Sequence, residues 1–283
     1  MVVLVTGASG QLGQAIVSVS ENYPKIDFHF ASSAEADVTD IQNLHTLFTR
    51  IKPDFCINAA AYTAVDKAES ETEKAYAINV TGAQNLAEIC KEFHTMLIHI
   101  STDFVFDGTK HEPYSEEDAT HPEGIYGVTK RQGEEAISAV FNEHIIIRTS
   151  WLYSEFGNNF MKTMLKLAND RPALNVVNDQ RGTPTYAVDL AQAILDIIIS
   201  DKKAFGIFHY SNEGEASWYD FAAKIFENNH VKIDLKPIPT SDYPTPAKRP
   251  AYSVLDKTKI KKTFGIQIPD WQESLKKIKP GSF

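Results

Sequence analysis

The sequence predicts an α/β protein built on a doubly wound parallel sheet, with a smaller α/β region after it. Short apolar runs rich in Val and Ile alternate with amphipathic stretches, which is typical of βαβ units. Glycines follow the first apolar run at once, where a parallel sheet passes into its first helix. The hydrophobic fraction of 43% and the charged fraction of 23% are those of a globular protein and argue against a disordered or coiled-coil chain.

The first part of the chain alternates predicted strands with predicted helices. Strands are expected at Val2–Thr6, Ile26–Phe30, Phe55–Asn58, Leu97–Ser101 and His144–Arg148. Helices are expected between them at Gln11–Ser20, Ile41–Arg50, Glu71–Phe93 and Tyr126–Phe141. Each helix is long enough for the crossover that parallel strands require. Residues 1–150 are therefore expected to form one doubly wound domain.

The pattern loosens after Arg148, and prolines accumulate between Pro237 and Pro250. Helices are predicted at Asn159–Asn169, Val188–Ile199 and Trp218–Asn229, and strands at Leu174–Val177 and Gly206–Tyr210. Residues 151–283 are expected to form a smaller region that packs on the first domain and is interleaved with it.

Charge and composition exclude several classes of partner. The net charge of −9 gives no basic patch for a phosphate backbone, so we expect no nucleic-acid partner. Nothing approaches the roughly 18 consecutive apolar residues of a membrane span, and the opening apolar run is too short for a signal peptide. Cys56 and Cys90 have no ligand-type neighbours and are expected to be reduced core residues. A cytoplasmic enzyme is the expectation.

A glycine-rich turn joins the first strand to the first helix. Its sequence is Gly7-Ala-Ser-Gly10-Gln11-Leu12-Gly13. Glycines in this position allow a tight turn and the close approach of a pyrophosphate, which the free N–H groups and dipole of the helix stabilise. The turn predicts a Rossmann-like dinucleotide site, the alternative being a βα turn that binds no ligand.

The end of the second strand bears on the choice of nicotinamide. That strand is followed by Ser32 and Ser33, where NAD-specific proteins usually have an acidic residue for the ribose. Without a carboxylate to repel a 2′-phosphate, we expect NADPH to bind at least as well as NADH. Asp37 could face the adenine, or the segment from Asp37 to Asp40 could simply start and cap the next helix.

Polar and small residues follow two further strands, at the edge where open α/β sheets bind ligands. Asn58-Ala-Ala-Ala61-Tyr62-Thr63 lets backbone approach a flat bound group, or else forms a tight packing turn. Ser101-Thr102-Asp103 places hydroxyls and a carboxylate at the end of the next strand.

Tyr126 and Lys130 form the sharpest chemical signal. Positions i and i+4 share a helix face, which brings a phenol and an ammonium into one site. A tyrosine with a pKa near 10 becomes a better acid–base catalyst when a nearby ammonium lowers that pKa. On an exposed helix the pair would carry no function, but its place after Ser101-Thr102-Asp103 favours a general acid.

These motifs, in this order, make the chain similar to extended short-chain dehydrogenases, and more closely it resembles the dTDP-4-dehydrorhamnose reductases. The resemblance covers nearly the whole chain. Its motifs are the segments 58–69, 101–108, Arg148-Thr-Ser-Trp151, Asn158-Asn-Phe160, Asn178-Asp-Gln180, Pro184-Thr185 and Pro244–Pro250.

The resemblance implies reduction of the 4-keto group of dTDP-4-dehydro-6-deoxy-L-mannose to dTDP-L-rhamnose, a precursor of bacterial surface polysaccharide, with NADPH or NADH. Tyr126 would give its proton to the developing C4 alkoxide. Lys130 would hold the nicotinamide ribose, and Thr102 would hydrogen-bond the reacting oxygen or the tyrosine. Residues 1–150 would bind NAD(P) and residues 151–283 would bind the dTDP-sugar.

The implied binding residues fall into two sets. The cofactor would contact Gly7, Gly10, Gln11, Leu12, Gly13, Asp37, Val38, Ala61, Tyr62, Thr63, Asn79, Tyr126 and Lys130. The sugar nucleotide would contact Val65, Thr102, Asp103, Trp151 and Arg249.

Other functions within the resemblance stay open. A dehydratase is disfavoured because Phe104, and not Glu, follows Asp103. Another nucleotide-sugar epimerase or reductase remains an alternative. So does a non-catalytic regulatory subunit of the methionine adenosyltransferase type, although Thr102, Tyr126 and Lys130 favour catalysis.

A metal-bridged dimer is not expected, although a homodimer of another kind remains open. Some relatives join subunits through Mg²⁺ held by acidic side chains, where this chain has Ala15 and Val188. Neither side chain offers the oxygen ligand that Mg²⁺ needs. We therefore predict no metal ligand in this chain.

Overall fold

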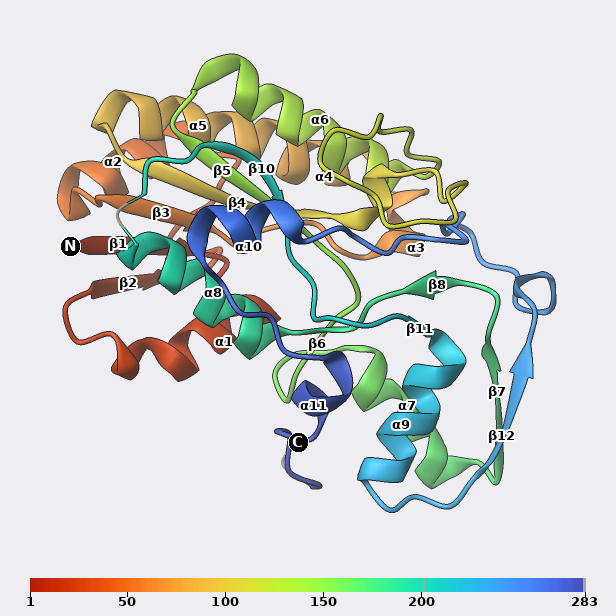
Figure 1. Cartoon of the computed structure of the whole chain (residues 1–283). Helices are drawn as coiled ribbons and strands as arrows, with labels where there is room; N and C mark the ends of the chain where they lie inside the picture. The colour runs from red at the N-terminus through yellow and green to blue at the C-terminus, as the bar shows by residue number, and fades with distance from the viewer. Residues whose placement is uncertain (201, 282–283) are drawn as a thin grey trace.

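The computed structural model describes residues 1–200 and 202–281. A six-stranded parallel sheet lies at its centre, with the strand order β10-β5-β4-β3-β1-β2 (Figure 1). Its strands are β1 (Val2–Thr6), β2 (Asp27–Ala31), β3 (Phe55–Asn58), β4 (Met96–Thr102), β5 (His144–Thr149) and β10 (Gly206–His209). The predicted doubly wound α/β fold is confirmed.

Helices cover both faces of this sheet because its strands are apolar on both sides. Val3 and Val5 of β1 face α1 (Gln11–Val19) and α8 (Ala187–Ile199). Leu4 points the opposite way, into a cluster with α2 (Ile41–Ile51), α5 (Gly82–Phe93) and α6 (Ile125–Val140). Cys56 and Cys90 are free and buried in that second cluster, as predicted.

The helix predicted over 71–93 runs without a break from Thr72 to Phe93, but one of its turns is π-helical. It consists of α4 (Thr72–Tyr76), a π-helical turn (Ala77–Thr81) and α5, and a short α3 (Val65–Ala68) precedes it. Such π turns are often found at functional sites. Here the turn carries Asn79, whose side chain is buried and reaches the loop after β3.

The second part of the molecule lies beyond the carboxyl ends of the sheet strands (Figure 1). Its core packs α7 (Phe160–Asp170), α9 (Trp218–Asn228) and α11 (Trp271–Leu275) together with the parallel pair β7 (Ala173–Val177) and β12 (Asp234–Ile238). Two short strand pairs join it to the first part: β6 (Leu152–Tyr153) with β9 (Thr185–Tyr186), and β8 (Arg181–Gly182) with β11 (Ala216–Ser217). Single 3₁₀ turns lie at Ser20–Asn22, Asp103–Val105 and Thr240–Asp242.

The chain crosses between the two parts more than once. After residue 151 it supplies α8, β10 and α10 (Thr258–Phe264) to the first part. A cut at residue 150 therefore does not separate two contiguous units.

The arrangement of the strands places the functional loops. Strand β1 lies between β2 and β3, so the loops after β1 and β3 diverge at a topological switch point, where open α/β sheets bind ligands. The two loops touch: Gly7 has φ +68°, and a Cβ there would lie 2.6 Å from the Ala60 nitrogen. Within residues 1–200 and 202–281, no helix is long and apolar enough to cross a membrane.

Candidate active site

One cavity of about 520 Å³ runs along the carboxyl ends of the central strands, from the glycine turn to the second part of the chain. It brings together twelve of the residues that the sequence predicted: Gly10, Gln11, Leu12, Ala61, Thr63, Val65, Thr102, Asp103, Tyr126, Lys130, Trp151 and Arg249. The glycine turn and the Tyr126–Lys130 pair thus open into the same space.

The glycine turn fits the phosphates of a dinucleotide. Helix α1 begins at Gln11, and the first N–H groups of any α-helix have no partner within the helix. No side chain caps this N-terminus. A Cβ on Gly10 would meet only the Gly7 oxygen, at 3.2 Å, and would otherwise point into open space. This leaves room for a phosphate at the positive end of a helix dipole.

Gly7 and Gly13 shape the turn and do not line the cavity. A Cβ on Gly13 would lie 2.5 Å from the Ala8 Cα, so this glycine is required for helix–turn packing. A direct contact of these two glycines with the cofactor stays a prediction.

Four more predicted cofactor residues do not line the cavity: Asp37, Val38, Tyr62 and Asn79. The Asp37 carboxylate accepts hydrogen bonds from the nitrogen (2.9 Å) and hydroxyl (2.7 Å) of Thr39 in a local turn. Asp40 caps α2 by accepting from Gln42 and Asn43, which confirms the capping interpretation for Asp40, while a contact of Asp37 with adenine stays a prediction. The Val38 side chain packs against Gly82.

Asn79 supports the wall from behind. Its Oδ1 accepts from the Tyr62 nitrogen at 2.9 Å, and its Nδ2 donates to the Tyr62 oxygen at 3.2 Å and to Thr129 Oγ1 at 3.1 Å. These bonds hold the backbone between Ala61 and Thr63, while the Tyr62 side chain is buried behind it.

A carboxylate does lie at the end of β2, contrary to the sequence-based expectation. Glu35 Oε2 accepts from the Ser32 nitrogen at 2.9 Å and from Ser32 Oγ at 3.0 Å. The sequence did not predict this contact, because Glu35 lies three residues after Ser32 and its side chain folds back toward the end of β2.

Tyr126 is held next to Thr102 and Asp103. Burial raises the pKa of Tyr126 to about 12, the hydrogen bond with Thr102 opposes that rise, and the nearby Asp103 charge adds to it. The prediction that an ammonium lowers this pKa is wrong for this arrangement. Lys130 Nζ instead donates to the Ile100 oxygen at 2.7 Å and lies 3.1 Å from His99 Nε2.

Burial shifts the pKa values of both Lys130 and Asp103. Burial lowers the pKa of Lys130 to about 8, against an opposing effect of the Glu134 carboxylate. Burial raises the pKa of Asp103 to about 6, although hydrogen bonds with Ser253 and Thr102 favour its charged form. Asp103 Oδ2 is buried without a hydrogen-bond partner. Such groups in a cleft are typical of active sites.

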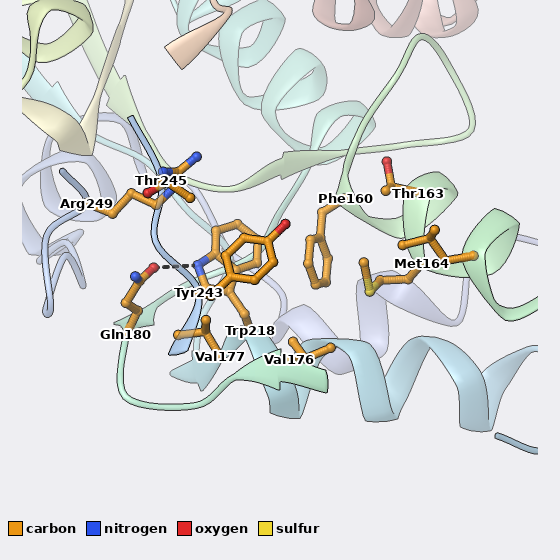
Figure 2. Close-up of a pocket in the computed structure, with 11 residues that line it drawn as sticks. Phe160, Thr163, Met164, Val176, Val177, Gln180, Trp218, Tyr243, Thr245 and Arg249 are labelled. Atoms are coloured by element: carbon orange, nitrogen blue, oxygen red, sulfur yellow. Dashed lines mark hydrogen bonds between the residues drawn. The ribbon is translucent and has the colours of Figure 1, made fainter. Parts of the chain in front are cut away.

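A second cavity of about 320 Å³ adjoins the first in the second part of the chain. Figure 2 shows its mostly apolar wall, with Phe160, Met164 and Tyr243 around it, and Gln180, whose Oε1 accepts a hydrogen bond from Trp218 Nε1 at 3.1 Å. Gln180 Nε2 donates to Thr240 Oγ1, also at 3.1 Å. Phe160, Trp218 and Arg249 line both cavities. Trp151 stacks on Trp218, with ring centroids 3.5 Å apart and planes 9° from parallel.

The sequence interpretation missed Trp218, Phe160 and Gln180 as site residues. Two of them, Phe160 and Gln180, lie in the motifs Asn158-Asn-Phe160 and Asn178-Asp-Gln180, which carry the family resemblance. Trp218 gave no local signal, because it opens an amphipathic helix whose other apolar residues form a core.

Arg249 is not a free loop cation. Its Nη1 and Nη2 donate to the two carboxylate oxygens of Asp66 at 3.1 and 2.8 Å, and Nη1 also donates to the Ala247 oxygen. The pair connects the proline-rich loop to the segment after β3. The hydrogen bond from Arg249 is the largest cause of the lowered pKa of Asp66.

Ala15 and Val188 lie where some relatives were expected to bind Mg²⁺. Ala15 is fully buried in α1, and Val188 packs against the same core from α8. In the part of the chain that the structure describes, no three His, Cys, Asp or Glu side chains are grouped to hold a metal ion.

Comparison with known proteins identifies the family. The family model described as RmlD substrate binding domain matches residues 1–280. The chain belongs to this family. A curated relative of the RmlD family, the dTDP-4-dehydrorhamnose reductase of Aggregatibacter actinomycetemcomitans, is 43% identical over 98% of this chain and 97% of its own length. The spore coat polysaccharide biosynthesis protein SpsK of Bacillus subtilis is 40% identical over 97% of this chain and 95% of its own.

Solved structures of this family share the whole fold. A dTDP-4-dehydrorhamnose reductase from Clostridium acetobutylicum has a TM-score of 0.94 and 42% identity, over 98% of each chain. The reductase of Bacillus anthracis, solved in complex with NADP, has a TM-score of 0.93 and 38% identity, also over 98% of each chain. A UDP-glucose 4-epimerase from Thermus thermophilus shares the fold at 18% identity, with a TM-score of 0.81.

Proposed function

We propose that this chain is an NADPH-dependent reductase that converts the 4-keto group of dTDP-4-dehydro-6-deoxy-L-mannose into the hydroxyl of dTDP-L-rhamnose. NADH is the alternative donor. The observation that supports this best is the single cavity in which the glycine turn, Thr102, Tyr126 and Lys130 meet. Family membership and the NADP complex of a relative support the same conclusion.

The side chains are suited to protonating an alkoxide. When bound, the reduced nicotinamide supplies the hydride that the carbonyl carbon accepts. Tyr126, with its pKa of about 12, keeps its proton at neutral pH and can give it to an oxygen of still higher basicity. Thr102 hydrogen-bonds Tyr126 and lines the cavity, so its hydroxyl can orient the phenol toward that oxygen.

Binding of the sugar nucleotide is assigned to the adjoining cavities. Phe160, Trp218 and Arg249 line both, so a ligand with a sugar at Tyr126 can extend its nucleotide over the aromatic wall shown in Figure 2. The Gln180 side chain offers an amide for a pyrimidine edge. Arg249, oriented by Asp66, presents its remaining N–H groups for a diphosphate.

The test is a direct assay of cofactor oxidation. Purified protein is mixed with NADPH and the dTDP-4-keto sugar, and the product is identified by mass spectrometry and NMR. We expect consumption of NADPH that matches formation of dTDP-L-rhamnose, and none with dTDP-glucose, which has no keto group. Formation of an epimer without net oxidation would reassign the protein to the epimerases. NADPH binding without turnover would favour a regulatory subunit.

The same assay with NADH measures cofactor preference. Glu35 accepts from Ser32 directly after β2, the part of the fold to which we assign the adenosine ribose, so its carboxylate would repel a 2′-phosphate there, while Ser32 could donate to one. Comparing kcat/KM for both nucleotides in the wild type and in Glu35→Gln shows whether this carboxylate sets the preference. The variant should gain activity with NADPH relative to NADH.

A further inference from the structure

His99 is a buried titratable residue that the proposed reaction does not use. It lies in the middle of β4, 1% exposed, between Asn58 of β3 and Lys130 of α6. Asn58 and His99 are register partners in neighbouring strands, which brings their side chains onto the same face of the sheet. His99 Nδ1 lies 2.9 Å from Asn58 Nδ2, and His99 Nε2 lies 3.1 Å from Lys130 Nζ.

The orientation of the Asn58 amide is fixed by a backbone donor. Asn58 Oδ1 accepts from the Ala60 nitrogen at 3.1 Å and from Thr6 Oγ1 at 2.8 Å. A backbone N–H can only donate, so the oxygen of the amide must face it, and the NH₂ group must face His99.

This orientation determines the tautomer of His99. Because Asn58 Nδ2 donates, His99 Nδ1 must accept, and the one proton of a neutral imidazole is then on Nε2. Burial is the largest cause that lowers the pKa of His99 well below its usual value, and it acts whatever the charge of Lys130, so the ring is neutral. The Nε2–H group therefore points at Lys130 Nζ.

An N–H group directed at Nζ makes a hydrogen bond only if Nζ has a lone pair. An ammonium has three donors and no acceptor, whereas an amine can accept one bond and still donate to the Ile100 oxygen at 2.7 Å. To charge Lys130 without a donor–donor contact, His99 must move its proton to Nδ1 and lose the bond from Asn58.

The other groups that face Lys130 do not reverse this preference. Glu134, one turn away on α6, favours the ammonium. Its carboxylate, however, is already bound by Arg148 of β5 at 2.7 and 2.9 Å and by Ser101 of β4. His144 of β5 interacts with His99 and not with Lys130, Tyr126 keeps its proton, and Asp103 interacts with Tyr126 and Thr102.

We propose that Asn58 and His99 are positioning residues that favour the neutral amine of Lys130 over its ammonium: Asn58 orients His99, and His99 Nε2–H donates a hydrogen bond to the lone pair that only the amine has. The proposal deepens the proposed function, since Lys130 is the partner of Tyr126 in it. Its consequence is that Lys130 gains and loses its proton close to physiological pH, so the charge beside Tyr126 is adjustable rather than permanent.

The first experiment reads the tautomer and needs no activity. Protein labelled with ¹⁵N-histidine contains nine histidines, and the His99→Leu variant identifies the signals of His99. We expect a neutral ring protonated at Nε2. In Asn58→Asp the new carboxylate accepts from Nδ1–H, so the ring should switch to the Nδ1 tautomer. A wild-type ring protonated at Nδ1 would overturn the proposal, whether or not the protein reduces the sugar.

The second experiment follows Lys130 through the pH profile of kcat. The wild type should lose activity as pH rises through about 8, where Lys130 loses its proton. Asn58→Asp and His99→Leu should both move this limb to higher pH, by about one unit or more, with little change in KM. His99→Leu adds no charge, so its shift cannot come from a new carboxylate.

His144→Leu is the matched control, because His144 is also a buried histidine but contacts Phe141 and Ser138, not Lys130. Its alkaline limb should stay within a few tenths of a unit of the wild type. If the limb is equally displaced in all three variants, or in none, His99 has only a structural role and the proposal fails.

Discussion

At the scale of single residues, Tyr126 is the group whose loss should isolate the chemistry. Removing the hydroxyl in Tyr126→Phe takes away the proton donor, while the ring keeps its edge-to-face contact with Phe104. We expect kcat to fall ~10²–10⁴-fold, which is the usual contribution of a general acid. NADPH affinity, measured by calorimetry, should be unchanged. Near-normal turnover would remove Tyr126 from the reaction.

Asp103 should make stability depend on pH. Its pKa is raised from 3.8 to about 6 by burial, so the native state is favoured below the lower value and loses stability as pH rises through the higher one. The side chain of Asp103→Asn stays neutral at every pH. The unfolding free energy of the variant minus that of the wild type should therefore increase as pH rises from about 4 to about 7, by at most ~3 kcal/mol. Urea unfolding at several pH values measures this.

A second aspartate gives the control for that experiment. The pKa of Asp107 is lowered, first by a backbone hydrogen bond from Thr109. Asp107→Asn should therefore lose stability relative to the wild type as pH rises, with the opposite slope. Parallel slopes for both variants would show that the Asp103 carboxyl is solvated.

At the scale of elements, two glycines of the turn between β1 and α1 are expected to differ in role: Gly10 in cofactor binding and Gly13 in packing. Gly10→Val should fold, because Gly10 has φ −76° and its side-chain position is open, but the side chain would occupy the space of the phosphates. NADPH binding should then be lost in calorimetry. Gly13→Ala should instead lower the thermal midpoint, since its Cβ would lie 2.5 Å from the Ala8 Cα. Unchanged NADPH affinity in Gly10→Val would displace the cofactor from this turn.

The element boundaries show what local sequence determines. Strands β1 and β3 lie where the apolar runs place them, and α1 begins at the predicted Gln11. The π turn within 71–93 was not predicted, because its helical periodicity continues on both sides. Only the contacts of Asn79 with Tyr62 and Thr129, far away in sequence, favour the extra residue in the turn.

At the scale of the whole molecule, the substrate site depends on contacts between its two parts. Trp151→Ala and Arg249→Ala should each raise KM for the dTDP-sugar and leave NADPH affinity intact. For Arg249 we expect ~10–100-fold, because hydrogen bonds to charged groups contribute about 1.5–3 kcal/mol. Arg249→Lys should also raise KM, since an ammonium cannot replace a guanidinium fork that Asp66 orients. Unaltered KM in Trp151→Ala and Arg249→Ala would exclude the second part from substrate recognition.

The sequence by itself determined the sheet, its βα order, the glycine turn, and the Thr102, Tyr126 and Lys130 set, because these features depend on local periodicity and on where strands end. Tertiary structure alone decided which charges and rings meet. Glu35 returns to Ser32, Asp66 binds Arg249 across the chain, and Trp218 stacks on Trp151. It also decided the protonation of the site: burial sets the pKa values of Tyr126 and Lys130, and burial is a property of the packed molecule rather than of neighbours in sequence.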